Sequence, residues 1–189
     1  MFRAPARRLP RRLVVLLRIL IAALSAVMSP HAGVLGAERT IALNDGFLVA
    51  ETRRHRRETW RWQRLMAVPV SPAADGELHP NHAYRRWVRD LWMRRAADAR
   101  RRAQDPPHEP EWLCIHSHEG AWNDPAPPYY GGLQMDIAFQ RAWGADLLAA
   151  KGTADRWTPL EQMWVAERAY RSGLRFTSWP NTARMCGVL

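Results

Sequence analysis

The stretch Thr158-Pro-Leu-Glu-Gln-Met-Trp-Val-Ala-Glu-Arg-Ala-Tyr-Arg171 contains the clearest helix signal of the chain. Thr158 and Glu161 have the spacing of a capping box, in which each side chain accepts a hydrogen bond from the other residue's backbone N–H. Pro159 stands at the first helical position, where its missing N–H costs nothing. We expect a helix that runs from here to Gly173, in a domain that is mainly helical.

Helix signals also stand before this stretch. Pro110 opens a helix that is predicted to end at Glu119. Asp136 is well placed to cap the N-terminus of another helix, which Gly144 terminates. Little of this part is typical of strand, apart from a short hairpin expected around Tyr129–Leu133. The sequence therefore predicts a mainly α fold with a minor β hairpin.

An Arg-rich segment, residues 38–107, precedes the domain predicted for residues 108–189. A helix over residues 44–67, opened by Asn44 or Asp45, is followed by a break rich in proline and glycine. A second helix is expected to begin near Asn81, with a narrow apolar stripe on an Arg-covered rod. Two such helices can form a hairpin.

Residues 1–37 have the pattern of an export signal. They carry six arginines and no acidic residue, and residues 13–27 are mostly apolar. This run is shorter than the roughly 20 residues that span a bilayer, which favours a cleaved signal peptide over a stable helix. Cleavage is expected near Ala32 or Ala37, and an uncleaved anchor is the alternative. Either way, the later residues are expected to be secreted or associated with the cell wall.

The formal net charge of +10 does not come from the C-terminal domain, because residues 106–189 carry seven Lys or Arg against nine Asp or Glu. A nucleic-acid-binding domain gathers basic charge on its binding surface. We therefore expect no nucleic-acid partner. The arginines of residues 53–102 are interpreted as the solvated face of a spacer. The alternative is that they hold the protein on anionic wall polymers or a membrane surface.

The two cysteines, Cys114 and Cys186, are an even count that suits one disulfide in an exported protein. Two unpaired buried thiols are the alternative. Cys114, His116, His118 and Glu119 could suggest a metal. Their spacing, however, matches neither the zincin His-Glu-x-x-His motif nor a structural zinc pattern. No metal or other cofactor is expected.

Glu119 is the candidate catalytic residue. Cleavage of a glycosidic bond requires an acid that protonates the leaving oxygen. Glu119 is expected at the end of a helix, close in sequence to Trp122, Tyr129 and Tyr130, and aromatic faces are surfaces on which sugar rings stack. A lone glutamate before a glycine turn is more commonly a surface residue.

Four sequence blocks stand in a fixed order along residues 110–189: Cys114-Ile-His-Ser-His-Glu-Gly-Ala-Trp122, Tyr129-Tyr-Gly-Gly-Leu-Gln134, Val165-Ala-Glu-Arg168, and Trp179-Pro180 with Cys186. In this order they resemble the transglycosylase-like domain of resuscitation-promoting factors, and the Tyr-Tyr-Gly-Gly-Leu-Gln block is the most specific. The chain departs from the family's Glu-Ser-Gly-Gly-x-Trp, because Glu119-Gly-Ala-Trp122 is two residues shorter.

The resemblance implies a compact lysozyme-like fold, peptidoglycan as the substrate and Glu119 as the catalytic acid. It also implies that Gln134 and the turn from Tyr129 through Tyr130 to Gly132 line the groove for the sugars. With these residues we group Trp122 as a substrate-binding aromatic.

No second catalytic carboxylate is evident. Asp136 is expected to cap a helix, and Asp124 to lie in a turn before a proline. Glu167 has Arg171 four residues later, which predicts an ion pair on a helix. A two-carboxylate hydrolase needs a second Asp or Glu, whereas a lytic transglycosylase can use one Glu as acid and then as base. We therefore favour a lytic transglycosylase over a muramidase-type hydrolase.

Two other classes of function stay open. A non-catalytic cell-wall-binding or signalling protein could retain the lysozyme-like fold. A basic envelope protein could instead bridge polyanions through residues 53–102. Activity of isolated residues 108–189 would favour the enzyme, whereas retention on cell walls only in the presence of the Arg-rich helices would favour the bridging protein.

Overall fold

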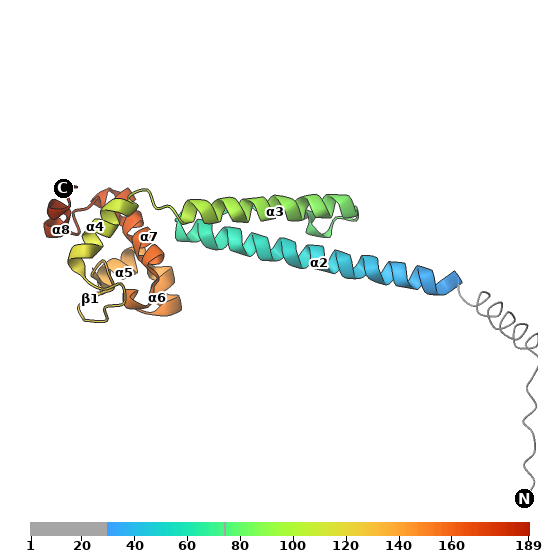
Figure 1. Ribbon diagram of the computed structural model, residues 1–189, viewed down its shortest axis with the longest axis horizontal. Helices are drawn as coiled ribbons and strands as arrows, with labels where there is room; N and C mark the ends of the chain where they lie inside the picture. Colours follow the sequence, from blue (N-terminus) through green and yellow to red (C-terminus); the bar gives the residue numbers. More distant parts are fainter. Residues whose placement is uncertain (1–29, 74) are drawn as a thin grey trace, which may run out of the picture. The chain divides into compact units, whose positions relative to one another are not determined.

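A computed structural model of the chain describes residues 30–73 and 75–189 (Figure 1). The chain divides into two compact units, residues 1–47 and 48–189. The predicted signal peptide falls mainly on residues 1–29, outside the described residues. Within the described ranges, no helix combines the length and the apolar character needed to cross a bilayer.

Helix α2 (Pro30–Leu65) begins before the predicted start at Asn44 or Asp45. That prediction of the helix start was wrong: residues 31–43 contain no proline that would stop a helix before Asn44, so the helix runs through the two polar residues instead of beginning at them. Helix α3 (His82–Ala103) does begin where predicted, because the side chain of Asn81 accepts a hydrogen bond from the backbone N–H of Tyr84.

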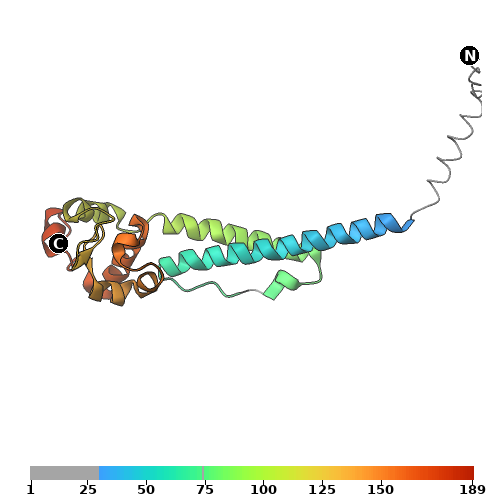
Figure 2. The same cartoon turned by 90° about the horizontal axis from the view of Figure 1, so that it is seen from below.

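Within residues 48–189, α3 and the later part of α2 lie side by side in both views (Figures 1 and 2). Trp92 is fully buried and packs edge to face against Trp60, with ring centroids 6.2 Å apart. The connection contains the short 3-10 helix η1 (Asp75–Leu78). Gln63 of α2 holds this connection at Ser71: its amide nitrogen donates to the Ser71 hydroxyl, and its amide oxygen accepts from the Ser71 backbone N–H, both at 2.8 Å.

The rest of the chain is a cluster of short helices with one hairpin. Its elements are α4 (Glu109–Glu119), β1 (Tyr129–Tyr130), β2 (Met135–Asp136), α5 (Ile137–Trp143), α6 (Ala145–Lys151), η2 (Ala154–Arg156), α7 (Pro159–Ala169), η3 (Tyr170–Leu174) and α8 (Pro180–Met185). The two strands pair antiparallel, with Tyr129 opposite Asp136. The prediction of a mainly helical fold with a minor hairpin is confirmed.

The predicted helix caps explain where these elements begin. Thr158 and Glu161 form both hydrogen bonds of the capping box at the start of α7. Asp136 caps α5 by accepting a 2.7 Å hydrogen bond from the backbone N–H of Phe139. The regular α-helix of α7 stops at Ala169, and a wider π-helical turn continues to Gly173, where the positive φ of 106° suits glycine.

Helix α7 lies at the centre of the domain. Its residues Met163, Val165 and Ala166 are part of a core that also contains Trp112, Ile115, Leu133, Met135, Ala154, Trp157, Phe176, Trp179 and Ala183. Figure 1 shows α7 among the neighbouring helices α4, α5 and α6. Burying this apolar surface is the main favourable term for the domain.

The end of α2 is also attached to α7. Trp164 packs with Trp62 and donates a 2.6 Å hydrogen bond to the carbonyl of Ala103, at the end of α3. The guanidinium of Arg168 donates to the carbonyls of Arg64 and Leu65. The last carbonyls of a helix have no partner within it, and a cation there also meets the negative end of the helix dipole. Residues of α7 therefore cap α2.

The predicted ion pair between Glu167 and Arg171 is wrong. Glu167 is fully buried, and its Oε1 accepts hydrogen bonds from the backbone N–H of His108 and from Nε1 of Trp112, with His108 Nδ1 also 2.7 Å away. Arg171 instead donates to the backbone carbonyls of Glu167 and Met66. The chain between Ala103 and α4 brings His108 to Glu167, so the carboxylate turns inward.

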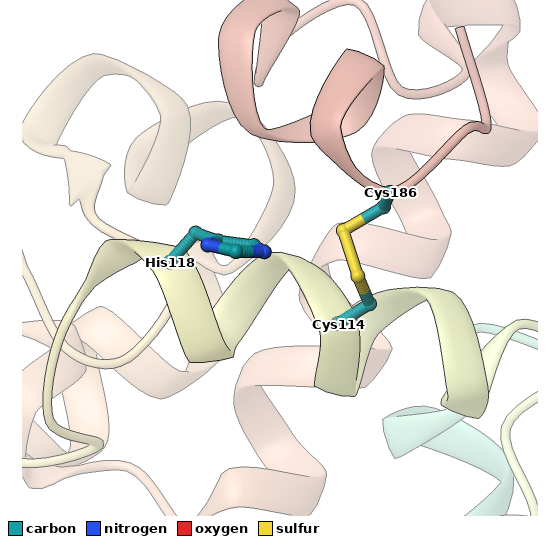
Figure 3. Close-up of side chains that lie close together, drawn as sticks. All are labelled: Cys114, His118 and Cys186. Carbon is teal, nitrogen blue, oxygen red and sulfur yellow. A yellow bond between two sulfur atoms is a disulfide. The ribbon is translucent and has the colours of Figure 1, made fainter.

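Cys114 and Cys186 form the predicted disulfide, with their Cα atoms 6.0 Å apart. It joins α4 to the end of α8 (Figure 3).

We expect the double substitution Cys114→Ala/Cys186→Ala to lower the free energy of unfolding by about 4 kcal/mol. This is the chain-entropy value for a loop closed across 72 residues. Urea unfolding of the full chain, monitored by circular dichroism, measures the change. An unchanged midpoint would show that the cross-link does not stabilise the domain.

We expect Glu167→Ala to cost at least about 2 kcal/mol of unfolding free energy, because it leaves the buried indole N–H of Trp112 and the part-buried backbone N–H of His108 without an acceptor. Glu167→Gln is the matched control and should cost less, because its amide oxygen can still accept at the Oε1 position. The same urea experiment compares them. If Glu167→Ala lowers the free energy of unfolding by less than about 0.5 kcal/mol, Glu167 does not have this role.

Candidate active site

Glu119 is the last residue of α4, and its carboxylate is held by α8. Oε1 of Glu119 accepts a 2.8 Å hydrogen bond from the hydroxyl of Thr182, a buried residue of α8. Two restraints position α8: the disulfide at Cys186 and a 2.6 Å hydrogen bond from Nε1 of Trp179 to the carbonyl of Leu133. Glu119 itself is half-buried. Its second oxygen, Oε2, has no hydrogen-bond donor among the described residues.

Gln134 and Asp124 pack against the backbone just after Glu119. A methyl group at Gly120 would lie 3.0 Å from Nε2 of Gln134 and 3.3 Å from Oδ2 of Asp124. Nε2 of Gln134 donates to that Asp124 oxygen at 3.0 Å and to the carbonyl of Gly131 at 2.9 Å. The absence of a side chain at Gly120 therefore lets the amide of Gln134 approach the end of α4.

The side chain of Trp122 is stacked on the ring of His116, with centroids 3.9 Å apart and planes 24° from parallel. The backbone of Gly132 lies against both rings. A Cβ atom there would be 2.6 Å from Nδ1 of His116 and 2.7 Å from the indole. The glycine is needed because of this close approach, and His116 orients the indole from one side.

Gln162, a fully buried residue of α7, ties the two loops of the site together. Its Oε1 accepts a 2.8 Å hydrogen bond from the backbone N–H of Gly132, and its Nε2 donates at 2.7 Å to the carbonyl of Trp122. The same Nε2 also donates to the carbonyl of Ala154. One amide thus fixes the Trp122 loop against the hairpin turn.

The two tyrosines of β1 differ. Tyr129 is about half exposed, at 51%. Tyr130 is half-buried and packs against the domain core. An exposed ring can stack on a sugar, whereas a ring that packs on the core supports the turn.

The structure thus brings Gln134 to Gly120, the residue after Glu119, and Trp122 to Gly132. Sequence reasoning missed Thr182 and Gln162, and it did not foresee that His116 stacks on Trp122. His116 lies in the quoted block around Glu119, but Thr182 is separated from Glu119 by 63 residues and Gln162 from Trp122 by 40. No local spacing pattern reports such contacts.

The metal alternative involved Cys114, His116, His118 and Glu119, and these four side chains do not converge. Among the described residues, ligand atoms of Cys114, His118 and Cys186 do lie within 4.8 Å of one another (Figure 3). The two sulfurs, however, are bonded to each other, so the group offers no thiolate ligand.

No protein-family model matches the chain, and neither a curated protein nor a solved structure matches it.

We expect Gly132→Ala to lower the free energy of unfolding by about 1–3 kcal/mol, because its methyl group overlaps the stacked rings of His116 and Trp122. Ala126→Ser also adds one heavy atom, but on an exposed loop residue, and should change the value by less than about 0.5 kcal/mol. Urea unfolding read by tryptophan fluorescence compares the two. Equal effects would show that the close packing at Gly132 is unimportant.

Proposed function

We propose that the protein is exported and cleaves peptidoglycan glycan strands as a lytic transglycosylase, with Glu119 as its acid and base in a small lysozyme-like domain. The proposal rests on the half-buried carboxylate of Glu119, which accepts a hydrogen bond from Thr182 at one oxygen, while Gln134 lies against the next residue, Gly120. The resemblance of the four sequence blocks to the transglycosylase-like domain supports the same assignment.

The hydrogen bond from Thr182 gives the two oxygens of Glu119 different roles. Because Oε1 accepts from the hydroxyl, we assign the proton that is transferred to Oε2. In the first step, Oε2–H protonates the glycosidic oxygen as the C1–O bond breaks and the sugar becomes oxocarbenium-like. In the second, the carboxylate takes the proton of the muramoyl C6 hydroxyl as that oxygen bonds to C1. A 1,6-anhydro ring results, and Glu119 is again protonated.

The contacts of the three carboxylates considered as a second catalytic group favour this one-carboxylate route. Oδ1 of Asp124 accepts from the backbone N–H of Ala126, and its Oδ2 accepts from Gln134. Asp136 caps α5, and Glu167 is buried behind Trp112. Each therefore has a structural partner. A hydrolase of the two-carboxylate kind would need one of them free as a base or nucleophile.

Aromatic and amide groups near Glu119 suit a glycan. The exposed ring of Tyr129 offers a face for a sugar ring, and Gln134 offers an amide for hydroxyl or N-acetyl groups. Trp122 is half-buried and has one face stacked on His116, so it would contact a sugar only through its remaining surface. We assign these residues, with the Tyr130–Gly132 turn that supports them, to substrate binding. The exposed arginines of residues 53–102 would hold the enzyme on anionic wall polymers or a membrane surface, an attraction that salt weakens.

We expect Glu119→Gln to lower the rate at which soluble muropeptides are released from purified peptidoglycan by about 10²- to 10⁴-fold or more, because glutamine cannot transfer the proton. Asp136→Asn is the matched control, also an acid-to-amide change, and should retain activity because asparagine caps a helix about as well. Thr182→Val should lie between them, because it removes only the hydroxyl that orients Oε1.

Circular dichroism of each variant checks that it is folded. Release by Glu119→Gln at the wild-type rate, or an equal loss in Asp136→Asn, would contradict the proposed role of Glu119. Wall binding without release by the wild-type protein would favour the non-catalytic wall-binding or signalling protein instead.

A further inference from the structure

A cavity of about 620 Å³ lies where the end of α2 meets α6 and the start of α7. We call it the junction cavity. Its apolar walls include Trp62 and Leu65 of α2, Leu147 of α6 and Leu160 of α7. Cavities that bind small molecules commonly span about 300–1,000 Å³ and are mainly apolar with a few polar groups. The junction cavity contains no residue that we assign to glycan cleavage.

The acids at this cavity are already neutralised within the protein. Asp146 pairs with Arg168 at 2.8 Å, and Glu161 pairs with Lys151 at 2.7 Å. Burial raises the pKa of the Asp146 carboxyl, but the hydrogen bond and charge of Arg168 outweigh burial, so its pKa lies below the ordinary value. Burial likewise raises the pKa of Glu161, and the hydrogen bonds from Lys151 and Thr158 bring it below the ordinary value. Both carboxylates therefore stay ionised at neutral pH.

Two arginines at the cavity are not neutralised by an acid among the described residues. Arg61 and Arg64 line it, both are exposed, and neither forms an ion pair among the residues that the structure describes. The guanidinium carbon of Arg61 lies 4.4 Å from the centre of the Trp62 ring, at the apolar wall. The cavity therefore combines an apolar interior with an uncompensated charge of two arginines. Arginine guanidinium groups match the oxygens of a phosphate, which they can bind in a bidentate way.

We propose that the junction cavity binds a single-chain lipid phosphate, with its alkyl chain against Trp62, Leu65 and Leu147 and its phosphate between Arg61 and Arg64. The proposal is independent of the activity proposed for Glu119. Because α2, α6 and α7 all contribute walls, such a ligand would stabilise the attachment of α2 to the domain.

The test is isothermal titration of the full exported chain with dodecyl phosphate below its micelle concentration. We expect saturable binding at one site. Arg61→Gln/Arg64→Gln should weaken the affinity at least about tenfold, because it removes hydrogen bonds to a charged group. The matched control is Arg57→Gln/Arg94→Gln, which changes the net charge equally at exposed arginines that do not line the cavity. It should bind within about twofold of the wild type.

Ala150→Trp tests the cavity itself, because this exposed residue of α6 lines the junction cavity and a large ring there fills it without removing an arginine. It should abolish binding while helicity is retained. Two reference compounds separate the parts of the ligand: inorganic phosphate is the head group alone, and dodecyl maltoside has the same alkyl chain with a neutral head group. Both should bind at least about tenfold more weakly than dodecyl phosphate. Equal weakening by the control pair, tight binding of either reference compound, undiminished binding to Ala150→Trp, or no binding of dodecyl phosphate would each overturn the proposal.

Discussion

The hydrogen bonds of one buried amide, Gln162 on α7, are the constraint on which the site depends. Its oxygen holds the turn at Gly132, and its nitrogen holds the loop at Trp122 and the carbonyl of Ala154. These partners lie in three separate segments of the chain, and none of the three is part of α7. A buried polar group left without partners costs free energy, so the arrangement is cooperative: the turn at Gly132 satisfies the amide oxygen, and the carbonyls of Trp122 and Ala154 share the amide nitrogen.

The same helix connects the site to the rest of residues 48–189. On one side, Glu167 accepts from His108 and Trp112 and so fixes the start of α4, the helix that ends at Glu119. On the other, Trp164 and Arg168 bind the ends of α3 and α2. The far end of α4 is fixed separately, through the disulfide to α8 and the Thr182 hydroxyl. The candidate catalytic carboxylate is therefore positioned from both ends of its helix, as precise acid/base chemistry requires.

The features predictable from the sequence are those that depend on neighbouring residues. The caps at Asn81, Asp136 and Thr158 involve contacts three residues apart, so their spacing reports them directly. The disulfide followed from an even cysteine count in a chain with an export pattern. Glu167 was misassigned because its partners lie 55 to 59 residues away and turn the side chain inward. Thr182 was missed for the same reason, since nothing near it in the sequence indicates a glutamate on another helix.

In the proposed mechanism one carboxylate performs both steps of glycan cleavage, and the chemical structure of the products is a direct test of it. A lytic transglycosylase uses the C6 hydroxyl as its internal nucleophile, whereas a hydrolase uses water. Mass spectrometry of purified peptidoglycan digested by the wild-type protein distinguishes the two, because they differ by one water per cleaved bond. We expect muropeptides that end in 1,6-anhydro sugars. Products that carry reducing ends instead, or the absence of any product, would contradict it.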